Sequence, residues 1–355
     1  MPSSMPSHMP PPPPLPIFQH PTLTVLVDDS PSFVQSLRFQ LGQAHPSIAF
    51  SDAAAALAWL RAQGNGESEL DGLLSPCIDS YSMEPQPFSV ALHVEQVCRI
   101  SLRPQRFMTP AVLVIDYAMP QMDGIAFCEA VQDLPCKKIL LTGVADERQA
   151  IDAFNRGLID RYIRKSDVDA LDRLETDLVR LRRDYFLERS SVVRGLLALH
   201  EYSFVSDPAI AALVDQVARN YQIVEYYLFN SPSGFLMYDS EARPHLLVIE
   251  TEQSMDTHIE VARDSGAQAA LLNALRKRQV VPNFSGGDGM YSPEFNQDWY
   301  NYTAPAQACR GREQYYWAMF DLPPGTPAGA VTPFSAFLRR HQDERGTPCQ
   351  DPANP

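Results

Sequence analysis

The sequence has no run of about 18 consecutive apolar residues, which is the length that a membrane-spanning helix requires. Its N-terminus also lacks the basic segment and apolar core of a secretory signal peptide. None of its six cysteines forms a Cys-x-x-Cys pair, and unpaired spacing of this kind suits a reducing compartment. We therefore expect a cytoplasmic protein without a membrane-spanning segment.

Positive charge is scarce as well. The chain holds 29 Lys and Arg against 43 Asp and Glu, which gives a formal net charge of −14 at pH 7. Both halves share the acidic excess, so neither offers the basic face that binds phosphate backbones. The second half also shows no helix-turn-helix with a basic recognition helix. We expect no nucleic-acid partner.

The length of 355 residues favours two domains, each large enough to bury a core. Residues 1–20 are rich in proline and carry no Asp, Glu, Lys or Arg, which predicts a disordered tail. We expect a first domain over 21–189 and a second over 190–325. Residues 326–355 form a second Pro-rich stretch, which we expect to be a C-terminal tail.

The first domain alternates short apolar runs with amphipathic segments. This order predicts a doubly wound α/β fold in which five parallel strands form one sheet with helices on both faces. A polar segment at 64–108, with one predicted helix near 88–102, interrupts the alternation. The predicted strands cover residues 22–27, 47–50, 111–115, 138–141 and 158–164.

Polar side chains follow four of these strands at the point where each strand ends. Asp28 and Asp29 follow the first strand, and Asp116 follows the third. Thr142 and Lys165 follow the fourth and the fifth. Because parallel strands end at one edge of a sheet, all five groups are expected to meet there. Three carboxylates that close together favour a bound Mg²⁺, and the whole set suits a carboxylate that accepts a phosphoryl group.

The motifs that carry these groups resemble the receiver domain of two-component response regulators, the CheY-like family. They are Val-Leu-Val-Asp-Asp (25–29), Val-Ile-Asp-Tyr-Ala-Met-Pro-Gln-Met-Asp-Gly (114–124), Leu-Leu-Thr-Gly (140–143) and Tyr-Ile-Arg-Lys (162–165). The resemblance covers about half of the chain. It implies that a sensor histidine kinase or a phosphotransfer protein is the partner.

By this resemblance, Asp116 is the phosphoryl acceptor. Mg²⁺ would be held by Asp28, Asp29 and the backbone carbonyl of Ala118. No other cofactor is implied, and no enzymatic activity is predicted beyond the domain's own phosphorylation and dephosphorylation.

The resemblance also implies roles for residues on the later strands. Thr142 and Lys165 would contact the phosphoryl group, and Tyr162 stands where the family carries its aromatic switch residue. The sequence of residues 157–165 is similar to that of regulators in quorum-sensing-type bacterial circuits. Such regulators combine a receiver with an output domain that does not bind DNA.

Two departures from the family pattern affect these expectations. The lysine of the family usually precedes a Pro in a cis bond, whereas Ser166 follows Lys165 here. A cis bond before Ser would cost about 3 kcal/mol, so we expect a trans bond or a reshaped loop and a less certain position for Lys165. The insert at 64–108 leads into a strand and so lies at the edge of the sheet opposite the site. Either this insert forms an interface with a second copy of the chain or with another domain, or it is a decorative loop.

The last helix of the first domain is predicted to run from Ser166 to about Arg189. Its Leu and Tyr side chains recur at steps of three and four residues, which indicates either a short coiled-coil seam or a stripe that packs on the domain's own sheet. Independently of this choice, we expect the protein to form a homodimer. The side chains are Leu171, Leu174, Leu178, Leu181 and Tyr185.

The second domain has an α+β pattern. Three runs at 225–229, 234–238 and 245–250 are joined by short turns, which predicts an antiparallel meander. A helix is expected at 253–278. Glu225, Tyr226, Tyr227 and Tyr238 could line a pocket or fill the core. The output is therefore expected to be protein interaction or small-ligand binding, with a receiver-controlled enzyme acting on a nucleotide or other small molecule as the alternative.

Overall fold

The computed structural model describes residues 14–64, 72–77, 89–143, 147–197, 202–284, 289–325 and 329–346. These residues divide into two compact units. The N-terminal unit comprises the described residues of 19–189, 240–242 and 329–346, and the C-terminal unit those of 14–18, 190–239 and 243–325. No helix within these ranges is long and apolar enough to cross a membrane.

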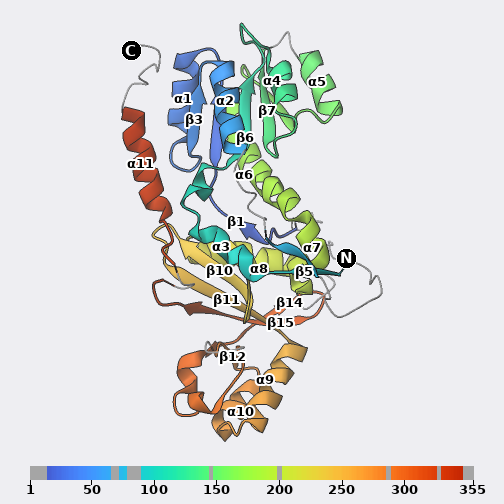
Figure 1. The fold of residues 1–355 in the computed structure, drawn as a ribbon, viewed down its shortest axis with the longest axis vertical. Helices are drawn as coiled ribbons and strands as arrows, with labels where there is room; N and C mark the ends of the chain where they lie inside the picture. The colour runs from blue at the N-terminus through green and yellow to red at the C-terminus, as the bar shows by residue number, and fades with distance from the viewer. Residues whose placement is uncertain are drawn as a thin grey trace, which may run out of the picture. The chain divides into compact units, whose positions relative to one another are not determined.

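The N-terminal unit is built on a five-stranded parallel sheet with the order β3-β2-β6-β7-β8. Strands β3, β6 and β7 of this sheet are labelled in Figure 1. The predicted doubly wound α/β fold is therefore confirmed. The three central strands are buried along almost their whole length, as expected where helices cover both faces of a parallel sheet. The strands are β2 (Leu23–Val27), β3 (Ser47–Phe50), β6 (Pro110–Asp116), β7 (Lys137–Thr142) and β8 (Arg161–Arg164).

Five helices cover this sheet. The apolar faces of α2, α4 and α5 pack in one cluster against the strands, while α1 and α6 contact the sheet outside that cluster. Phe127 and Leu140 are fully buried at the centre of the cluster. The helices are α1 (Pro31–Leu41), α2 (Ala53–Gly64), α4 (Gly124–Ala130), α5 (Glu147–Asn155) and α6 (Ala170–Arg189).

The leucine stripe of α6 packs within the N-terminal unit. Leu174, Leu178, Leu181 and Tyr185 are buried, and α6 contacts strands β6, β7 and β8. Of the two alternatives for this stripe, the structure favours packing on the unit's own sheet. The helix begins at Ala170, four residues later than predicted.

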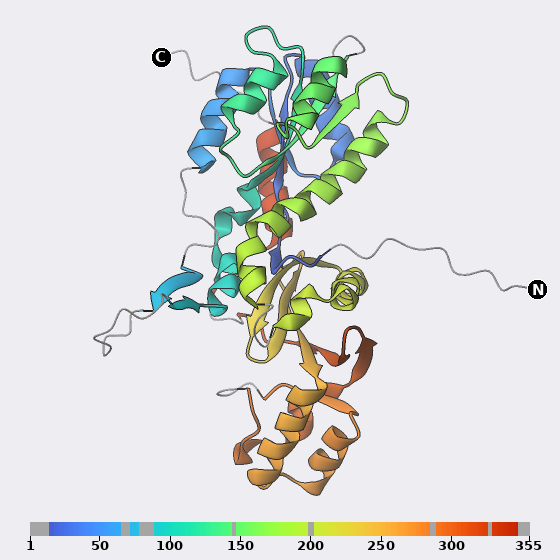
Figure 2. The same cartoon turned by 90° about the vertical axis from the view of Figure 1, so that its right-hand side faces the viewer.

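The insert contains more than the single predicted helix. Strands β4 (Leu74–Cys77) and β5 (Ser89–Leu92) form an antiparallel pair, drawn as the blue and teal arrows in Figure 2. They are followed by α3 (Glu95–Arg99) and the 3₁₀ turns η1 (Ile100–Leu102) and η2 (Pro104–Met108). Because η2 leads into the first residue of β6, the insert joins the sheet at the edge opposite the strand ends that carry the acids.

The C-terminal stretch is only partly the Pro-rich tail that composition predicts. Residues Phe334–Gly346 form helix α11, which belongs to the N-terminal unit. The rings of Phe334 and Phe337 lie 5.2 and 5.4 Å from that of Phe107. His341 Nε2 and the carbonyl oxygen of Ser47 are 2.9 Å apart. The predicted tail is therefore wrong for α11, because tilted ring contacts with Phe107 of the insert stabilise a segment whose own sequence is polar.

We expect Phe337→Ala to loosen α11 from the insert. The ring is only partly buried, so its loss should cost about 1–3 kcal/mol, less than a fully buried Phe. Amide exchange in peptides covering η2 and α11 should therefore accelerate roughly 10-fold to 100-fold. The control is Arg339→Ala, at an exposed position of the same helix, which should leave exchange unchanged. Equal exchange in both variants would show that the ring contacts do not hold α11.

His45 gives the N-terminal unit a predictable pH dependence. The residue is 7% exposed, and its Nδ1 lies 3.2 Å from an Arg182 guanidinium nitrogen. Burial, with a smaller contribution from Arg182, lowers the pKa of His45 to about 4. In the unfolded chain its pKa is about 6.5, so between these values the unfolded state binds more protons. Stability must therefore fall as pH drops from about 6.5 to about 4.

The contribution of His45 to this acid destabilisation should reach at most about 3 kcal/mol. We expect His45→Gln to make the free energy of unfolding of the N-terminal unit less sensitive to pH. Urea unfolding at about pH 7.5 and about pH 5 measures the difference. An identical loss of stability in wild type and variant would contradict the role of His45.

The C-terminal unit contains an antiparallel sheet with the order β1-β9-β10-β11-β15-β14. The predicted meander corresponds to β9, β10 and β11, and the structure adds β14 and a separate pair formed by β12 and β13. The strands are β1 (Phe18–Gln19), β9 (Ile223–Asn230), β10 (Ser233–Asp239), β11 (Pro244–Thr251), β12 (Val280–Pro282), β13 (Thr303–Pro305), β14 (Gln307–Arg310) and β15 (Gln314–Asp321).

The expected N-terminal tail is wrong for its last residues. Leu15, Ile17 and Phe18 are fully buried, and the carbonyl of Ile17 accepts a hydrogen bond of 2.7 Å from the amide of Leu228 in β9. Residues 1–13 lie outside the described residues. Three apolar side chains among prolines are thus sufficient to add a strand to the edge of the sheet.

The helices of this unit are shorter than predicted. The single helix expected at 253–278 is two, because Gly266 adopts a left-handed conformation with φ of 74° and ends the first. The elements are α7 (Ser191–Leu197), η4 (Ser203–Ser206), α8 (Pro208–Asn220), α9 (Glu252–Asp264), α10 (Ala269–Arg276), η5 (Pro293–Phe295) and η6 (Trp299–Tyr302).

The aromatic side chains of the meander fill the core. Tyr226, Tyr227 and Tyr238 are each at most 5% exposed. Tyr227 and Tyr238 meet edge to face at 6.3 Å between ring centroids, and Tyr227 donates a 2.7 Å hydrogen bond to buried Glu225. Of the two roles that the sequence left open for these residues, the structure supports packing.

Candidate functional site

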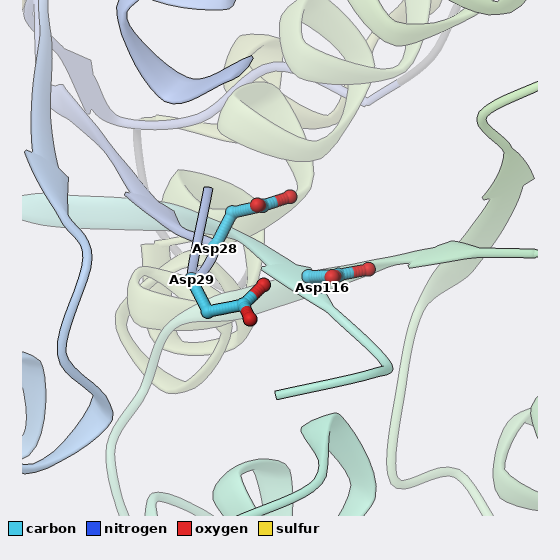
Figure 3. A group of neighbouring side chains, drawn as sticks. All are labelled: Asp28, Asp29 and Asp116. Atoms are coloured by element: carbon cyan, nitrogen blue, oxygen red, sulfur yellow. The ribbon is translucent and has the colours of Figure 1, made fainter. Parts of the chain in front are cut away.

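Three carboxylates lie together at the edge of the parallel sheet of the N-terminal unit. Asp28 and Asp29 directly follow β2, and Asp116 is the last residue of the neighbouring strand β6. One oxygen from each carboxylate lies within 4.8 Å of the other two, and Figure 3 shows the three side chains at the ends of their strands. Asp28 and Asp116 are buried and Asp29 is exposed, so the cluster is open to solvent on the side of Asp29.

The local sequence fixes both strand ends. The amide of Ser30 donates to Asp28 Oδ1 at 2.9 Å, and the Ser30 hydroxyl accepts from Phe33 to cap α1. On the other strand, the amide of Gly124 donates to the Tyr117 carbonyl at 2.8 Å, which closes the loop after Asp116. Sequence reasoning had assigned no role to Ser30, although a Ser before Pro is a common helix start.

Lys165 lies between the two buried acids. Its Nζ is 2.6 Å from Asp28 Oδ2 and 2.9 Å from Asp116 Oδ1. The Lys165 amide also donates to the Thr142 carbonyl at 3.0 Å, which fixes the backbone at the end of β8. The Lys165–Ser166 bond is trans, as the expected cost of a cis bond suggests, and the ammonium still reaches both acids.

The charge of Lys165 is stable at neutral pH. Burial alone would lower the pKa of this ammonium, but hydrogen bonds and attraction to Asp116 and Asp28 outweigh burial and raise it above its usual value. The cluster therefore carries three carboxylates against one ammonium, a net charge of −2. A hard divalent cation suits this set of oxygen donors and this charge.

The remaining predicted site residues are Thr142, Ala118 and Tyr162, and each lies on a different element. Thr142 ends β7, one position beyond the level of Asp116, and its fully buried hydroxyl has no hydrogen-bond partner among the described residues. Ala118 is exposed in the loop between β6 and α4. Tyr162 lies on β8 and packs edge to face on Phe154 of α5, with 6.4 Å between the ring centroids. Val144–Asp146, which follow Thr142, lie outside the described residues.

A shallow cleft of about 200 Å³ opens beside Asp29. Its walls come from the loops after β3 and β6, which are far apart in the sequence, so periodicity alone could not have predicted it. The cleft gives small molecules access to the exposed acid. It is lined by Asp29, Ser51, Asp52, Ala53, Met119, Pro120 and Gln121.

No protein-family model matches the sequence, and none of the curated proteins does. The fold is similar to that of the Legionella pneumophila response regulator LqsR, with a TM-score of 0.73 and 27% sequence identity. This likeness covers 96% of the present chain and 98% of LqsR, so it includes both units.

Single receiver domains show lower similarity. One from Clostridium thermocellum is 17% identical, with a TM-score of 0.31 over 48% of this chain and 98% of that one. The receiver of a putative Luxo repressor protein from Vibrio parahaemolyticus is 14% identical, with a TM-score of 0.32 over 47% of this chain and 95% of that one. The doubly wound sheet, the acids at its strand ends and the full-length likeness to LqsR identify the chain as a two-component response regulator, with an N-terminal receiver domain and a distinct C-terminal domain.

Proposed function

We propose that Asp116 accepts a phosphoryl group from a sensor histidine kinase or a phosphotransfer protein. The observation that carries this proposal is the Lys165 ammonium, which lies within 2.9 Å of both Asp28 and Asp116 while Asp29 faces solvent beside them. A buried carboxylate beside a fixed ammonium and two further acids suits phosphoryl transfer, which depends mainly on positioning and charge neutralisation.

In the transfer, a carboxylate oxygen of Asp116 forms a bond to phosphorus while the bond between phosphorus and the donor nitrogen breaks. The acyl phosphate carries more negative charge than the carboxylate that it replaces, and Lys165 stabilises that charge. The hydroxyl of Thr142 can donate a hydrogen bond to a phosphoryl oxygen.

Mg²⁺ fits the oxygen donors of this cluster. Asp28, Asp29 and the carbonyl of Ala118 would hold the ion, which when bound supplies positive charge to the transferring group.

Phosphorylation would be communicated through the elements beside Thr142 and Tyr162. Tyr162 contacts α5 through Phe154, and ion pairs join Arg164 to Glu147 and Arg161 to Asp177. Strand β8 is thus linked to both α5 and α6. Movement of Tyr162 would alter this face, which also exposes apolar side chains of α5 and suits a homodimer contact in a cytoplasmic protein.

For the C-terminal domain we favour an output by protein interaction. Its tyrosines pack in the core, where Tyr226 meets Phe235 edge to face at 5.7 Å between centroids. Small-ligand binding and a receiver-controlled enzyme acting on a nucleotide are the alternatives. A thermal-shift screen of nucleotides against the full chain distinguishes them. A shifted melting temperature with any nucleotide would favour the alternatives.

The proposed acceptor is tested by incubating the full chain with acetyl phosphate and MgCl₂ and measuring its intact mass. We expect the wild type to gain one phosphoryl group and Asp116→Asn to gain none. Asp52→Asn is the matched control, because Asp52 borders the same cleft and Asn retains its cap on α2. Absence of a gain in the wild type, or a full gain in Asp116→Asn, would refute the proposal.

A further inference from the structure

In addition to the carboxylates of Asp28 and Asp116, an aromatic ring lies beside the Lys165 ammonium. The ring of Phe33 faces it, with 4.5 Å between Nζ and the ring centroid. A cation is attracted to an aromatic face within roughly 6 Å of the centroid. We propose that Phe33 is a positioning residue, which holds the Lys165 ammonium between Asp28 and Asp116.

The position of the ring follows from the start of α1. Phe33 occupies the first turn of this helix, where its amide donates to the Ser30 hydroxyl at 3.4 Å. Ser30 in turn donates its own amide to Asp28 Oδ1 at 2.9 Å. Neighbouring Val34 is buried and anchors the turn to the core. The ring and the Asp28 carboxylate are therefore fixed by one short segment, so that Phe33 keeps its position relative to the acid.

Lys165 has particular need of such a neighbour. Its four-carbon side chain is flexible and 28% exposed, so water competes for the ammonium. A Pro after the lysine would restrict the lysine's backbone conformation, but Ser166 follows here and imposes no such restriction. Contact with Phe33 supplies a restraint from the side chain instead.

The ring differs from the two acids in one chemical respect. Asp28 and Asp116 change their interactions when a cation or a phosphoryl group arrives, whereas the face of Phe33 carries no titratable group and accepts no phosphoryl group. Its attraction for the ammonium therefore persists while the charge opposite Lys165 changes. This consequence rests on the proposed phosphorylation of Asp116, although the contact itself exists in the unmodified protein.

The contact is tested in the full chain without Mg²⁺ or a phosphoryl donor, by the rate at which acetic anhydride acylates Lys165. The variants are Phe33→Leu, which keeps an apolar side chain without a ring, and Phe33→Tyr, which keeps the ring. Exposed Lys277 in the C-terminal unit is the internal reference. We expect Phe33→Leu to raise the relative rate at Lys165 roughly twofold to fivefold and Phe33→Tyr to leave it unchanged.

Two acylation results would overturn the inference. One is an unchanged rate in Phe33→Leu, and the other is an equal increase in both variants, which would show that packing and not the ring face matters. Equal thermal unfolding midpoints for the three proteins exclude a general loss of structure. If the midpoints differ, the acylation rates are compared at a temperature where all three proteins are folded.

Phosphoryl uptake from acetyl phosphate gives a second readout. We expect Phe33→Leu to slow uptake by the same roughly twofold to fivefold factor and Phe33→Tyr to restore the wild-type rate. If the wild type takes up no phosphoryl group, the proposed function fails, while the acylation rates still decide whether Phe33 restrains Lys165. If the wild type is modified and the three rates are equal, the positioning role is wrong and the proposed function stands.

Discussion

Lys165→Met should slow phosphoryl uptake by Asp116 by about 10²-fold, comparable to the loss of one preorganised charge-stabilising group in an active site. The ammonium lies 2.6 Å from Asp28 and 2.9 Å from Asp116, and Met has similar length without charge. Removing the cation leaves two buried carboxylates facing each other and gives the acyl phosphate no compensating charge. The uptake rate is measured by intact mass over time.

The same substitution should have the opposite effect on Mg²⁺. Loss of one positive charge changes the net charge of the cluster from −2 to −3, so the affinity for a divalent cation should rise, by roughly tenfold at a partly solvated site. Isothermal titration calorimetry with MgCl₂ measures this affinity. A variant that lost both Mg²⁺ binding and uptake would indicate a collapsed site, and our assignment of Lys165 would then lack support.

Gly124→Ala should destabilise the receiver domain by about 3 kcal/mol, at the upper end of the usual cost of overpacking. A Cβ at this position would lie 2.4 Å from the backbone oxygen of Asp116 and 2.7 Å from a methyl carbon of Leu140. The first contact is with backbone, which cannot rotate away, so the end of β6 must shift. We therefore also expect slower phosphoryl uptake, because the carboxylate of Asp116 moves with its backbone.

Gly195→Ala provides a control of opposite sign. Gly195 lies within α7, where a Cβ would meet nothing within 4 Å. Alanine should therefore stabilise that helix by roughly 0.5–1 kcal/mol. Urea unfolding of both variants against wild type measures the two effects. A Gly124→Ala protein as stable as wild type would mean that β6 and α4 do not approach as closely as described.

The sheet and the acid cluster could be predicted because both depend on local patterns. Apolar runs such as 111–115 indicate central strands of a parallel sheet, and parallel strands bring their carboxyl ends to one edge. Asp28, Asp29 and Asp116 therefore meet, as their positions after strands predict. The trans bond before Ser166 was also expected, from the cost of the cis form.

The elements that the sequence did not indicate depend on contacts between distant residues. In helix α11, the ring of Phe337 packs at a tilt against Phe107 of the insert, and His341 contacts Ser47 from 294 positions away in the chain. By composition, both α11 and the insert are Pro-rich or polar. Neither segment has an apolar face that runs along its whole length. Phe18, likewise, joins the sheet as part of β1 only because β9 offers its edge.

The contact between the Phe33 ring and Lys165 also joins residues that are distant in the sequence. Phe33 lies at the start of α1 and Lys165 directly follows β8, and no spacing rule relates the two residues. Only the folded geometry shows that the predicted lysine has this neighbour.

Chemical trapping of the modified residue tests the central claim most directly. Sodium borohydride reduces an aspartyl phosphate to homoserine, so treatment of the phosphorylated full chain followed by peptide mass spectrometry identifies the acceptor. We predict homoserine at position 116, and its absence when Mg²⁺ is removed with EDTA. Homoserine at position 28 or 29, or none in a protein that has gained a phosphoryl group, would contradict the assignment of Asp116.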